Sequence, residues 1–237
     1  MMFKIFPSVI KKYPGLNIGV IIAAGADNKG ISRKLTHLLE EVEEYIRMDF
    51  VPTELARAPL ISPWRTAYQE FGSKPSRFNC SVEAMMKRIL KGGSLPKINK
   101  LVDLCNYISL KHIIPLGIYD LDKAKPPISI RHAEGDERFI PLGSDKSECP
   151  EEGEIIYEDN IKRAICRRWN WRDSEETKVT EETKNAIIFI DGLPPITKKK
   201  IEEIQTEMQD LITAFCGGKA SAQIAHKDLA TVEFEKE

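Results

Sequence analysis

The residues with the greatest chemical potential lie between Cys166 and Asp191, in the stretch CRRWNWRDSEETKVTEETKNAIIFID. If this stretch begins as an extended strand, successive side chains point to opposite faces. The first face would then hold Arg167, Trp169 and Trp171. The second face would hold Arg168, Asn170 and Arg172. Guanidinium groups bind planar carboxylate or phosphate oxygens two at a time, and an amide adds a donor and an acceptor. The second face therefore predicts an anion-binding row.

The same residues also have a purely structural interpretation. Two indoles, which bury about 150–250 Å² each when packed, are suited to a hydrophobic core. The arginines would then pair with nearby carboxylates such as Asp173, Glu175 or Glu176. These residues by themselves favour neither interpretation.

A predicted helix that begins at Asn99 carries polar residues among apolar ones. Apolar side chains lie on nearly all of its sides, at Leu101, Val102, Leu104, Cys105, Ile108 and Leu110. A helix of this kind is buried, and an unpaired buried amide costs about 1–3 kcal/mol. Asp103 and Asn106 must therefore bond to neighbours or line a cavity. For Asp103 a role at a turn or helix start is favoured, whereas for Asn106 both interpretations stay open.

Composition limits the classes of protein that fit. A chain of 237 residues can bury a core without disulfides, and its five widely spaced cysteines indicate reduced thiols in a cytosolic protein. No segment approaches ~18 consecutive apolar residues, and no secretion signal is present at the N-terminus. We therefore expect a cytoplasmic location and no membrane partner. The formal charge of -1 gives no general affinity for polyanions.

Local basic clusters remain as possible nucleic-acid contacts. The first cluster comprises Lys87, Arg88, Lys91, Lys97 and Lys100. The second comprises Lys162, Arg163, Arg167, Arg168 and Arg172. Most such runs are solvated helix faces, so the clusters suggest RNA contact without establishing it.

Common catalytic motifs are absent from the sequence. It has no phosphate-binding G-x-x-x-x-G-K-[ST], no G-x-G-x-x-G after a strand and no H-E-x-x-H. The four histidines show no metal-ligand spacing, and no nucleophile elbow or Cys-His pairing is visible. We expect no metal and no cofactor. If the protein is an enzyme, it activates water or uses groups of its substrate.

The predicted elements place these residues in one α+β domain. A strand over 18–24 is followed by helices that begin near Ser32, Ser62, Ser81 and Asn99, then by a strand-rich region and a long helix from Thr197. We expect a strand-helix extension over 1–75, a core over 76–192, and a helix with a loosely held polar tail over 193–237. No internal repeat or linker divides the chain.

Two long segments resemble a known family. KGGSLPKINKLVDLCNYISLKHIIPLGIYDLDK, from Lys91 to Lys123, is similar to I-N-x-V-V-D-x-x-N-Y-V followed by P-L-x-x-x-D; Cys166 to Asp191 is similar to V-x-x-E-T-x-N-V-L-L. Both patterns occur in the editing domain of the beta subunit of bacterial phenylalanyl-tRNA synthetase. Its standalone relatives also look similar in YPGLNIG, WRTAYQEFGSKPS and RRWNWR.

The resemblance implies a fold, an activity and a partner. The fold would be α+β, with a mixed β-sheet core of the editing-domain type flanked by helices. The activity would be hydrolysis of misacylated tRNA in trans, and the partner would be the aminoacylated 3′ end of a tRNA, with no DNA. Ester hydrolysis needs only a positioned water and donors for the oxyanion, which suits a sequence without a nucleophile motif.

Carrying the family's pocket over residue by residue gives a mixed result. Asn106 and Asp103 match the pocket asparagine and its acidic neighbour. The pocket histidine and glutamate fall on Gly117 and Phe189, so a specificity for tyrosine does not carry over. The catalytic candidates are Asn106, Arg168 and Asn170. The substrate-binding candidates are Asp103, Gly117, Arg167, Trp169, Trp171, Arg172, Ser174, Thr177, Thr180 and Phe189.

Two other functions remain open. One is a non-catalytic module that binds tRNA or other RNA through the basic clusters. The other is a protein that binds an amino-acid-like small molecule through the arginine row. The sequence does not indicate which amino acid or tRNA is recognised, or the oligomeric state.

Overall fold

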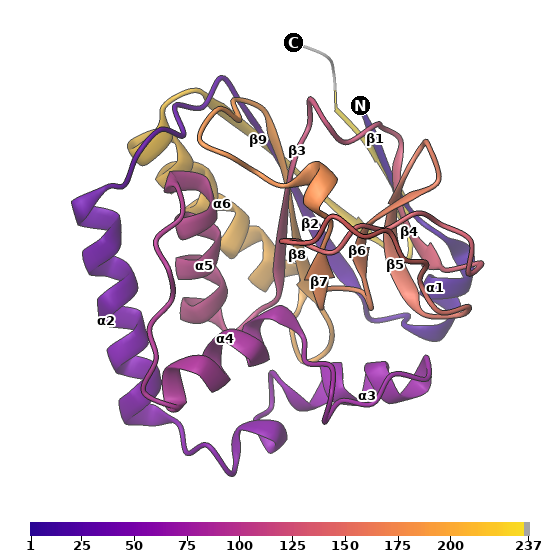
Figure 1. Ribbon diagram of the computed structural model, residues 1–237, viewed down its shortest axis with the longest axis horizontal. Helices are drawn as coiled ribbons and strands as arrows, with labels where there is room; N and C mark the ends of the chain where they lie inside the picture. Colours follow the sequence, from indigo (N-terminus) through magenta and orange to yellow (C-terminus); the bar gives the residue numbers. More distant parts are fainter. Residues whose placement is uncertain (235–237) are drawn as a thin grey trace.

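A computed structural model describes residues 1–234. It contains two β-sheets packed face to face, with helices covering the outer face of the smaller sheet (Figure 1). The strands are β1 (Met2–Ile5), β2 (Asn17–Ala24), β3 (Leu116–Asp120), β4 (Ile128–His132), β5 (Ile155–Asp159), β6 (Arg163–Arg167), β7 (Arg172–Asp173), β8 (Ala186–Gly192), β9 (Lys219–His226) and β10 (Thr231–Glu233). The α-helices are α1 (Pro7–Lys12), α2 (Arg33–Asp49), α3 (Ser62–Glu70), α4 (Ser81–Leu90), α5 (Lys100–His112) and α6 (Lys198–Cys216).

The two sheets differ in strand order. The larger sheet has the order β10-β1-β4-β5-β6-β7, and the smaller has the order β3-β8-β2-β9. The β1–β4 pair is parallel and the other pairs are antiparallel. The predicted α+β class, with a mixed sheet flanked by helices, is therefore confirmed.

Strand β8 shows why the two sheets and the helices form layers. Its side chains alternate between the faces of the smaller sheet. Ile187 and Phe189 pack with residues of the larger sheet such as Phe3, whereas Ile188 and Ile190 pack against α5 and α6. Because both faces are covered, the strand is apolar almost throughout and all of its residues are buried.

Side-chain caps begin three of the helices as expected. Ser32, Asn99 and Thr197 each accept a hydrogen bond from the backbone N–H three residues later. The helices expected near Ser62 and Ser81 are present, but neither serine is the cap, because both residues lie inside the first turn and Ile61 and Cys80 occupy the cap positions. The Ser81 hydroxyl is thereby available for another role.

The C-terminal segment after α6 differs from the expectation. β9 pairs with β2 along eight residues, from Asn17 to Ala24, and β10 pairs with β1. The predicted loosely held tail is therefore wrong up to residue 234, because its backbone bonds complete both sheets. The last three residues of that prediction lie outside the described part of the chain.

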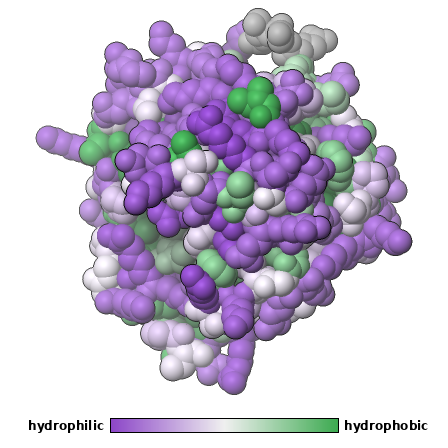
Figure 2. All heavy atoms as spheres, turned by 45° about the vertical axis from the view of Figure 1, so that its right-hand side comes forward, coloured by the Kyte–Doolittle hydropathy of each residue, from purple (hydrophilic) through white to green (hydrophobic). Residues whose placement is uncertain are grey.

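The face of the molecule drawn in Figure 2 carries no large apolar area. The side of the molecule in Figure 2 is mostly hydrophilic, and its hydrophobic residues form small separate groups. Within residues 1–234, none of the helices combines the length and hydrophobicity that a membrane crossing requires.

Candidate functional site

The predicted alternation of arginines and tryptophans ends at Arg167. β6 stops there, and a four-residue turn leads to β7, which pairs back on it. Arg168 and Trp169 adopt left-handed backbone conformations, with φ of 46° and 65°. The N–H of Asn170 donates to the carbonyl of Arg168 at 2.8 Å, which tightens the turn. The expected strand with one anion-binding row is therefore wrong, because this backbone is not extended.

Two arginines of this segment are buried in ion pairs. Arg167 donates to both carboxylate oxygens of Glu154, at 2.8 and 2.9 Å, and to Glu148 at 2.6 Å. Arg168 is 3% exposed and donates to Glu151 at 2.7 Å. Arg172 is exposed and donates to a backbone carbonyl. Arg167 and Arg168 thus have the structural role that the sequence left open, with glutamates from the preceding loop as partners.

The same turn encloses a small cavity between the two sheets. Its volume is about 30 Å³, and its walls include four of the predicted residues, Gly117, Trp169, Asn170 and Trp171. The other lining residues are Ser81, Leu116, Tyr119, Tyr157, Asp173 and Asp191. A single water needs roughly 10–15 Å³ on this measure. The cavity therefore has room for one or two waters.

A buried hydrogen-bond chain forms one wall of this cavity. The Tyr68 hydroxyl donates to Oδ1 of Asn170 at 3.0 Å, and Nδ2 of Asn170 donates to Oδ2 of Asp191 at 3.0 Å. The Tyr157 hydroxyl donates to the other carboxylate oxygen of Asp191. With both sides of its amide engaged, Asn170 has a fixed orientation. The chain therefore holds the Asp191 carboxylate in place.

Burial changes the acidity of Asp191. The side chain is 1% exposed, and this burial raises its pKa to about 6, because a desolvated carboxylate is disfavoured. Hydrogen bonds from Tyr157 and Asn170, and the nearby indole N–H of Trp169, oppose the rise in pKa. A carboxyl that titrates close to neutral pH is suited to accept a proton from water.

Two donors of the cavity wall are unused. The Ser81 hydroxyl and the indole nitrogen of Trp169 are buried, and neither has a hydrogen-bond partner among the described residues. Trp169 itself is fully buried against Tyr13 and Trp64. An unpaired buried donor is costly and uncommon in a folded protein. The Ser81 hydroxyl is thus free to bond to a water or a ligand in the cavity, whereas the indole N–H of Trp169 also lies near the Asp191 carboxylate, whose pKa it lowers.

Gly117 and Phe189 lie directly opposite each other in the β3–β8 pair. A Cβ atom at Gly117 would lie 2.5 Å from the Tyr119 hydroxyl, so the glycine makes room for that group. Tyr119 donates to Asp173 at 2.8 Å, and burial raises the pKa of this second carboxyl. Phe189 stacks on Tyr157 with ring centroids 4.7 Å apart. Aromatic groups therefore fill much of the space near these two positions.

Other predicted residues lie outside the cavity wall. Asp103 accepts the N–H of Ile98 at 3.0 Å, the helix-start role favoured from the sequence, and burial raises its pKa. Asn106 is half-buried on α5, and its side chain makes no hydrogen bond within the described residues. Ser174 begins a short 3-10 helix and accepts the N–H of Glu176. The remaining two are Thr177, whose hydroxyl is unpaired, and Thr180, whose N–H donates to Thr183.

Sequence reasoning missed most of the polar wall, namely Tyr68, Ser81, Tyr119, Tyr157, Asp173 and Asp191. Asp191 carried one usable signal, because a lone carboxylate at the end of an apolar strand must find partners. The tyrosines carried none, since tyrosine is common in half-buried strands.

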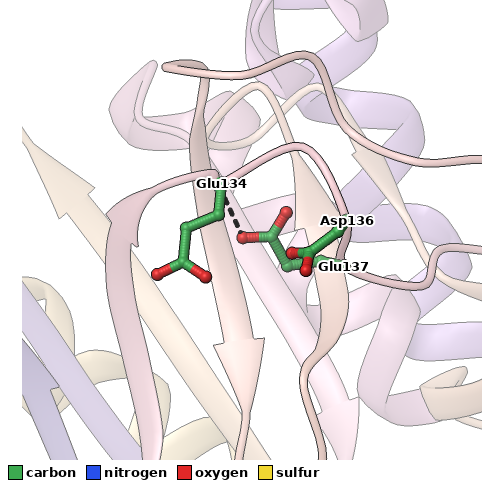
Figure 3. A group of neighbouring side chains, drawn as sticks. All are labelled: Glu134, Asp136 and Glu137. Atoms are coloured by element: carbon green, nitrogen blue, oxygen red, sulfur yellow. Dashed lines mark hydrogen bonds between the residues drawn. The ribbon is translucent and has the colours of Figure 1, made fainter.

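A separate group of carboxylates, Glu134, Asp136 and Glu137, gathers in one loop (Figure 3). Glu137 is buried and accepts the N–H of Glu134 at 2.8 Å. Arg131 pairs with Glu137 at 2.7 Å, and Lys162 pairs with Asp136 at 2.7 Å. Cations of the protein already balance this group, so its geometry does not call for a metal ion.

The sequence pattern of the B3/4 domain matches residues 63–214. The chain belongs to the B3/4 domain family. The matched region contains every residue of the cavity wall, including Ser81 and Asp191, and the Tyr68 that supports it. The cavity is therefore part of the B3/4 fold and not of the flanking segments.

The B3/4 match agrees with similarity to beta subunits of phenylalanine–tRNA ligase. The chain is 31% identical to that of Carboxydothermus hydrogenoformans over 115 residues, covering 48% of this chain and 14% of the relative. It is 29% identical to that of Thermococcus kodakarensis over 153 residues, covering 52% of this chain and 26% of the relative. The predicted resemblance is confirmed, and the chain spans about a quarter or less of these relatives' length.

A solved structure gives a similar comparison. An N-terminal fragment of the phenylalanyl-tRNA synthetase beta subunit from Pyrococcus horikoshii aligns over 92% of this chain and 49% of the fragment. The TM-score is 0.48 and the sequence identity is 17%.

Proposed function

We propose that this B3/4 protein hydrolyses the ester bond of misacylated tRNA in trans. The observation that carries the proposal is one water-sized cavity lined by a buried carboxylate, Asp191, and by two unused donors, Ser81 and Trp169. Similarity to phenylalanine–tRNA ligase beta subunits supports a tRNA substrate. Such a substrate agrees with the cytoplasmic location expected from the sequence.

Asp191 acts as the general base in this proposal. A water in the cavity gives a proton to the Asp191 carboxylate while its oxygen attacks the ester carbonyl carbon. The bond from that carbon to the ribose oxygen then breaks, and the ribose oxygen takes the proton back from Asp191. The products are the free amino acid and a tRNA with a free 3′ terminus. A base with a pKa of about 6 is largely ionised at neutral pH and remains basic enough to act.

Asn170 and Tyr157 act as positioning residues. Each donates to a different oxygen of Asp191, which leaves the carboxylate little freedom to rotate. Tyr68 fixes the amide of Asn170 from the other side. A general base is effective only when it is held within hydrogen-bond reach of the attacking water.

Ser81 and Trp169 would stabilise the oxyanion. The tetrahedral intermediate carries a negative oxygen, which needs donors that have no competing partner. The hydroxyl of Ser81 meets this condition, whereas the indole N–H of Trp169, which makes no other hydrogen bond, would turn from the Asp191 carboxylate to the oxyanion. Removing one such donor typically lowers the rate by about 100- to 1000-fold.

The size of the cavity favours small substrates. About 30 Å³ admits water but not an amino acid side chain, and the Tyr119 hydroxyl occupies the space above Gly117. The amino acid part of the ester must therefore sit at the mouth or in the little space beside Tyr119. Esters of small amino acids fit this arrangement better than esters of aromatic ones.

The competing RNA-binding function draws less support from the predicted basic clusters. Lys87 pairs with Glu83 at 2.7 Å, Lys100 with Asp27 at 2.9 Å, and Lys162 with Asp136. Cations neutralised within the protein contribute little to a field that attracts polyanions.

Release of free amino acid from a panel of mischarged tRNAs tests the proposal. The wild-type protein should accelerate release above the spontaneous rate for at least one small amino acid. Asp191→Asn should abolish that acceleration, whereas Asp145→Asn, which changes an exposed carboxylate that is not part of the cavity wall, should preserve it. No acceleration with any member of the panel would exclude the deacylase function.

A further inference from the structure

A group of aromatic and arginine side chains adjoins the cavity. Phe78 and Trp171 meet edge to face, with ring centroids 4.8 Å apart. Arg77 lies over the Phe78 ring at 5.1 Å, and Arg172 lies over the Trp171 ring at 6.0 Å. We call Arg77, Phe78, Trp171 and Arg172 the aromatic platform. It joins the segment before α4 to the turn before β7.

Arg168 holds the platform in place from beneath. Its guanidinium lies 3.8 Å from the Phe78 ring centroid and 4.8 Å from that of Trp171. The arginine is buried and anchored to Glu151 at 2.7 Å. Two rings packed on an immobilised cation lose little freedom when a ligand binds, so the platform is preorganised.

The outer arginines of the platform carry uncompensated charge. Arg77 and Arg172 are exposed, and neither pairs with a carboxylate within the described residues. The buried arginines differ, because Arg167 and Arg168 are both neutralised by glutamates. The platform therefore offers half-buried ring surface between two guanidinium groups that no carboxylate neutralises within the described residues, which matches the alternation of base and phosphate in a single strand.

We infer that the aromatic platform binds the unpaired 3′-terminal nucleotides of an RNA. Bases stack on Phe78 and Trp171, and the phosphates between them contact Arg77 and Arg172. Trp171 also lines the cavity, so a strand that ends on the platform brings its terminal ribose beside Asp191. This inference extends the proposed function by naming the surface that delivers the ester, and binding can be measured on uncharged RNA without any hydrolysis.

The test uses a fluorescent RNA hairpin with four unpaired nucleotides at its 3′ end. A blunt hairpin of the same stem is the control probe. Arg77→Ala combined with Arg172→Ala tests the phosphate contacts, and Arg33→Ala is the matched control. Arg33 is also exposed without a carboxylate partner within the described residues, and it begins α2, which lies at the left of Figure 1, whereas β7 lies near the centre.

Fluorescence anisotropy at several salt concentrations gives the dissociation constants. The wild type should bind the overhang hairpin more tightly than the blunt one. The double variant should lower the slope of log K against log salt by about 1.4, since each single-strand phosphate contact contributes about 0.7. Trp171→Ala should weaken overhang binding on the order of 10- to 100-fold, and Trp171→Phe should restore much of it. Arg33→Ala should change neither quantity.

Two results would overturn the inference. One is equal affinity of the wild type for the overhang and blunt hairpins. The other is an unchanged salt slope in the double variant. If deacylation is absent but these binding effects appear, the proposed function fails and the platform stands. If deacylation occurs but RNA binding is unaffected by the platform variants, the proposed function stands and the platform inference fails.

Discussion

Asp191→Asn should separate stability from activity, because the buried carboxylate that is proposed to act as the base also opposes folding at neutral pH. Burial raises its pKa from 3.8 to about 6 in the folded protein. At about 1.36 kcal/mol per pKa unit, this shift corresponds to about 3 kcal/mol. The side chain is almost fully buried, so solvent does not screen the effect.

The sign of the effect follows from proton linkage. The folded protein holds the proton of Asp191 more tightly than the unfolded chain does, so low pH favours the fold. The contribution of Asp191 is fully present below pH 3.8 and is lost as pH rises to about 6. Asparagine does not titrate. The free energy of unfolding of Asp191→Asn, minus that of the wild type, should therefore rise by about 3 kcal/mol between pH 4 and pH 7.

The loss of a hydrogen-bond acceptor also lowers the free energy of unfolding of Asp191→Asn, by an amount that does not depend on pH. The two carboxylate oxygens accept from Tyr157 and Asn170, and an asparagine side chain offers only one acceptor oxygen. A poorly satisfied donor costs about 1–3 kcal/mol. This cost shifts the whole curve of the variant downward without changing its slope, so the difference between two pH values remains a clean measure of the raised pKa.

Urea unfolding, followed by tryptophan fluorescence at pH 4 to 8, measures these free energies. Deacylation by the same variant at pH 7 should fall by about 100- to 10,000-fold, the usual contribution of a general base. Parallel stability curves for wild type and variant would refute the reasoning, because Asp191 would then not titrate with a raised pKa in the fold.

Two further predictions concern the same cavity. The single-turnover deacylation rate should fall about tenfold per pH unit below pH 6 and level off above it, since only the ionised Asp191 accepts a proton; a flat profile from pH 5 to 8 would contradict this role. Gly117→Ala should destabilise the protein by about 1–3 kcal/mol in urea unfolding, because the added Cβ would lie 2.5 Å from the Tyr119 hydroxyl. The loss should shrink in a Tyr119→Phe background, and an equal loss there would show that the strain lies elsewhere.

Local sequence signals predicted the starts of the longer helices well. Asn99 and Thr197 begin their helices through side-chain caps that depend only on residues three positions away. The almost wholly apolar β8 has the pattern that is typical of a strand buried on both faces. Such features need no knowledge of distant residues, so the sequence is sufficient to predict them.

The arginine row could not be judged from local sequence. Its interpretation required an extended backbone, yet Arg168 and Trp169 take left-handed conformations that bulky residues rarely adopt. Distant contacts maintain this geometry: Trp169 donates its backbone N–H to Ile155, and Glu151 binds the Arg168 side chain. The backbone conformation of Arg168 and Trp169 thus depends on contacts with β5 and with the loop before it, which carries Glu151.

The polar wall of the cavity was hidden for a related reason. Tyr68 and Asn170 are 102 positions apart in the chain, and Tyr157 and Asp191 are 34 apart. Tyr157 and Asp191 meet because β5 and β8 belong to different sheets that pack face to face. Gly117 was singled out through the family resemblance, and Trp169, Asn170 and Trp171 through their residue types; all four line the cavity, but neither signal indicated their partners.

The location of Asp191 argues for function on energetic grounds. An ionised carboxylate between two sheets lowers stability by about 3 kcal/mol at neutral pH, a large share of the roughly 5–15 kcal/mol that stabilises a typical domain. An apolar residue at this position would avoid that cost, and Ile190 and Phe189 beside it show that the strand accommodates such residues. The unused donors of Ser81 and Trp169 add a second cost in the same cavity. Folding alone explains neither cost, whereas a bound water that attacks an ester requires both the base and the donors.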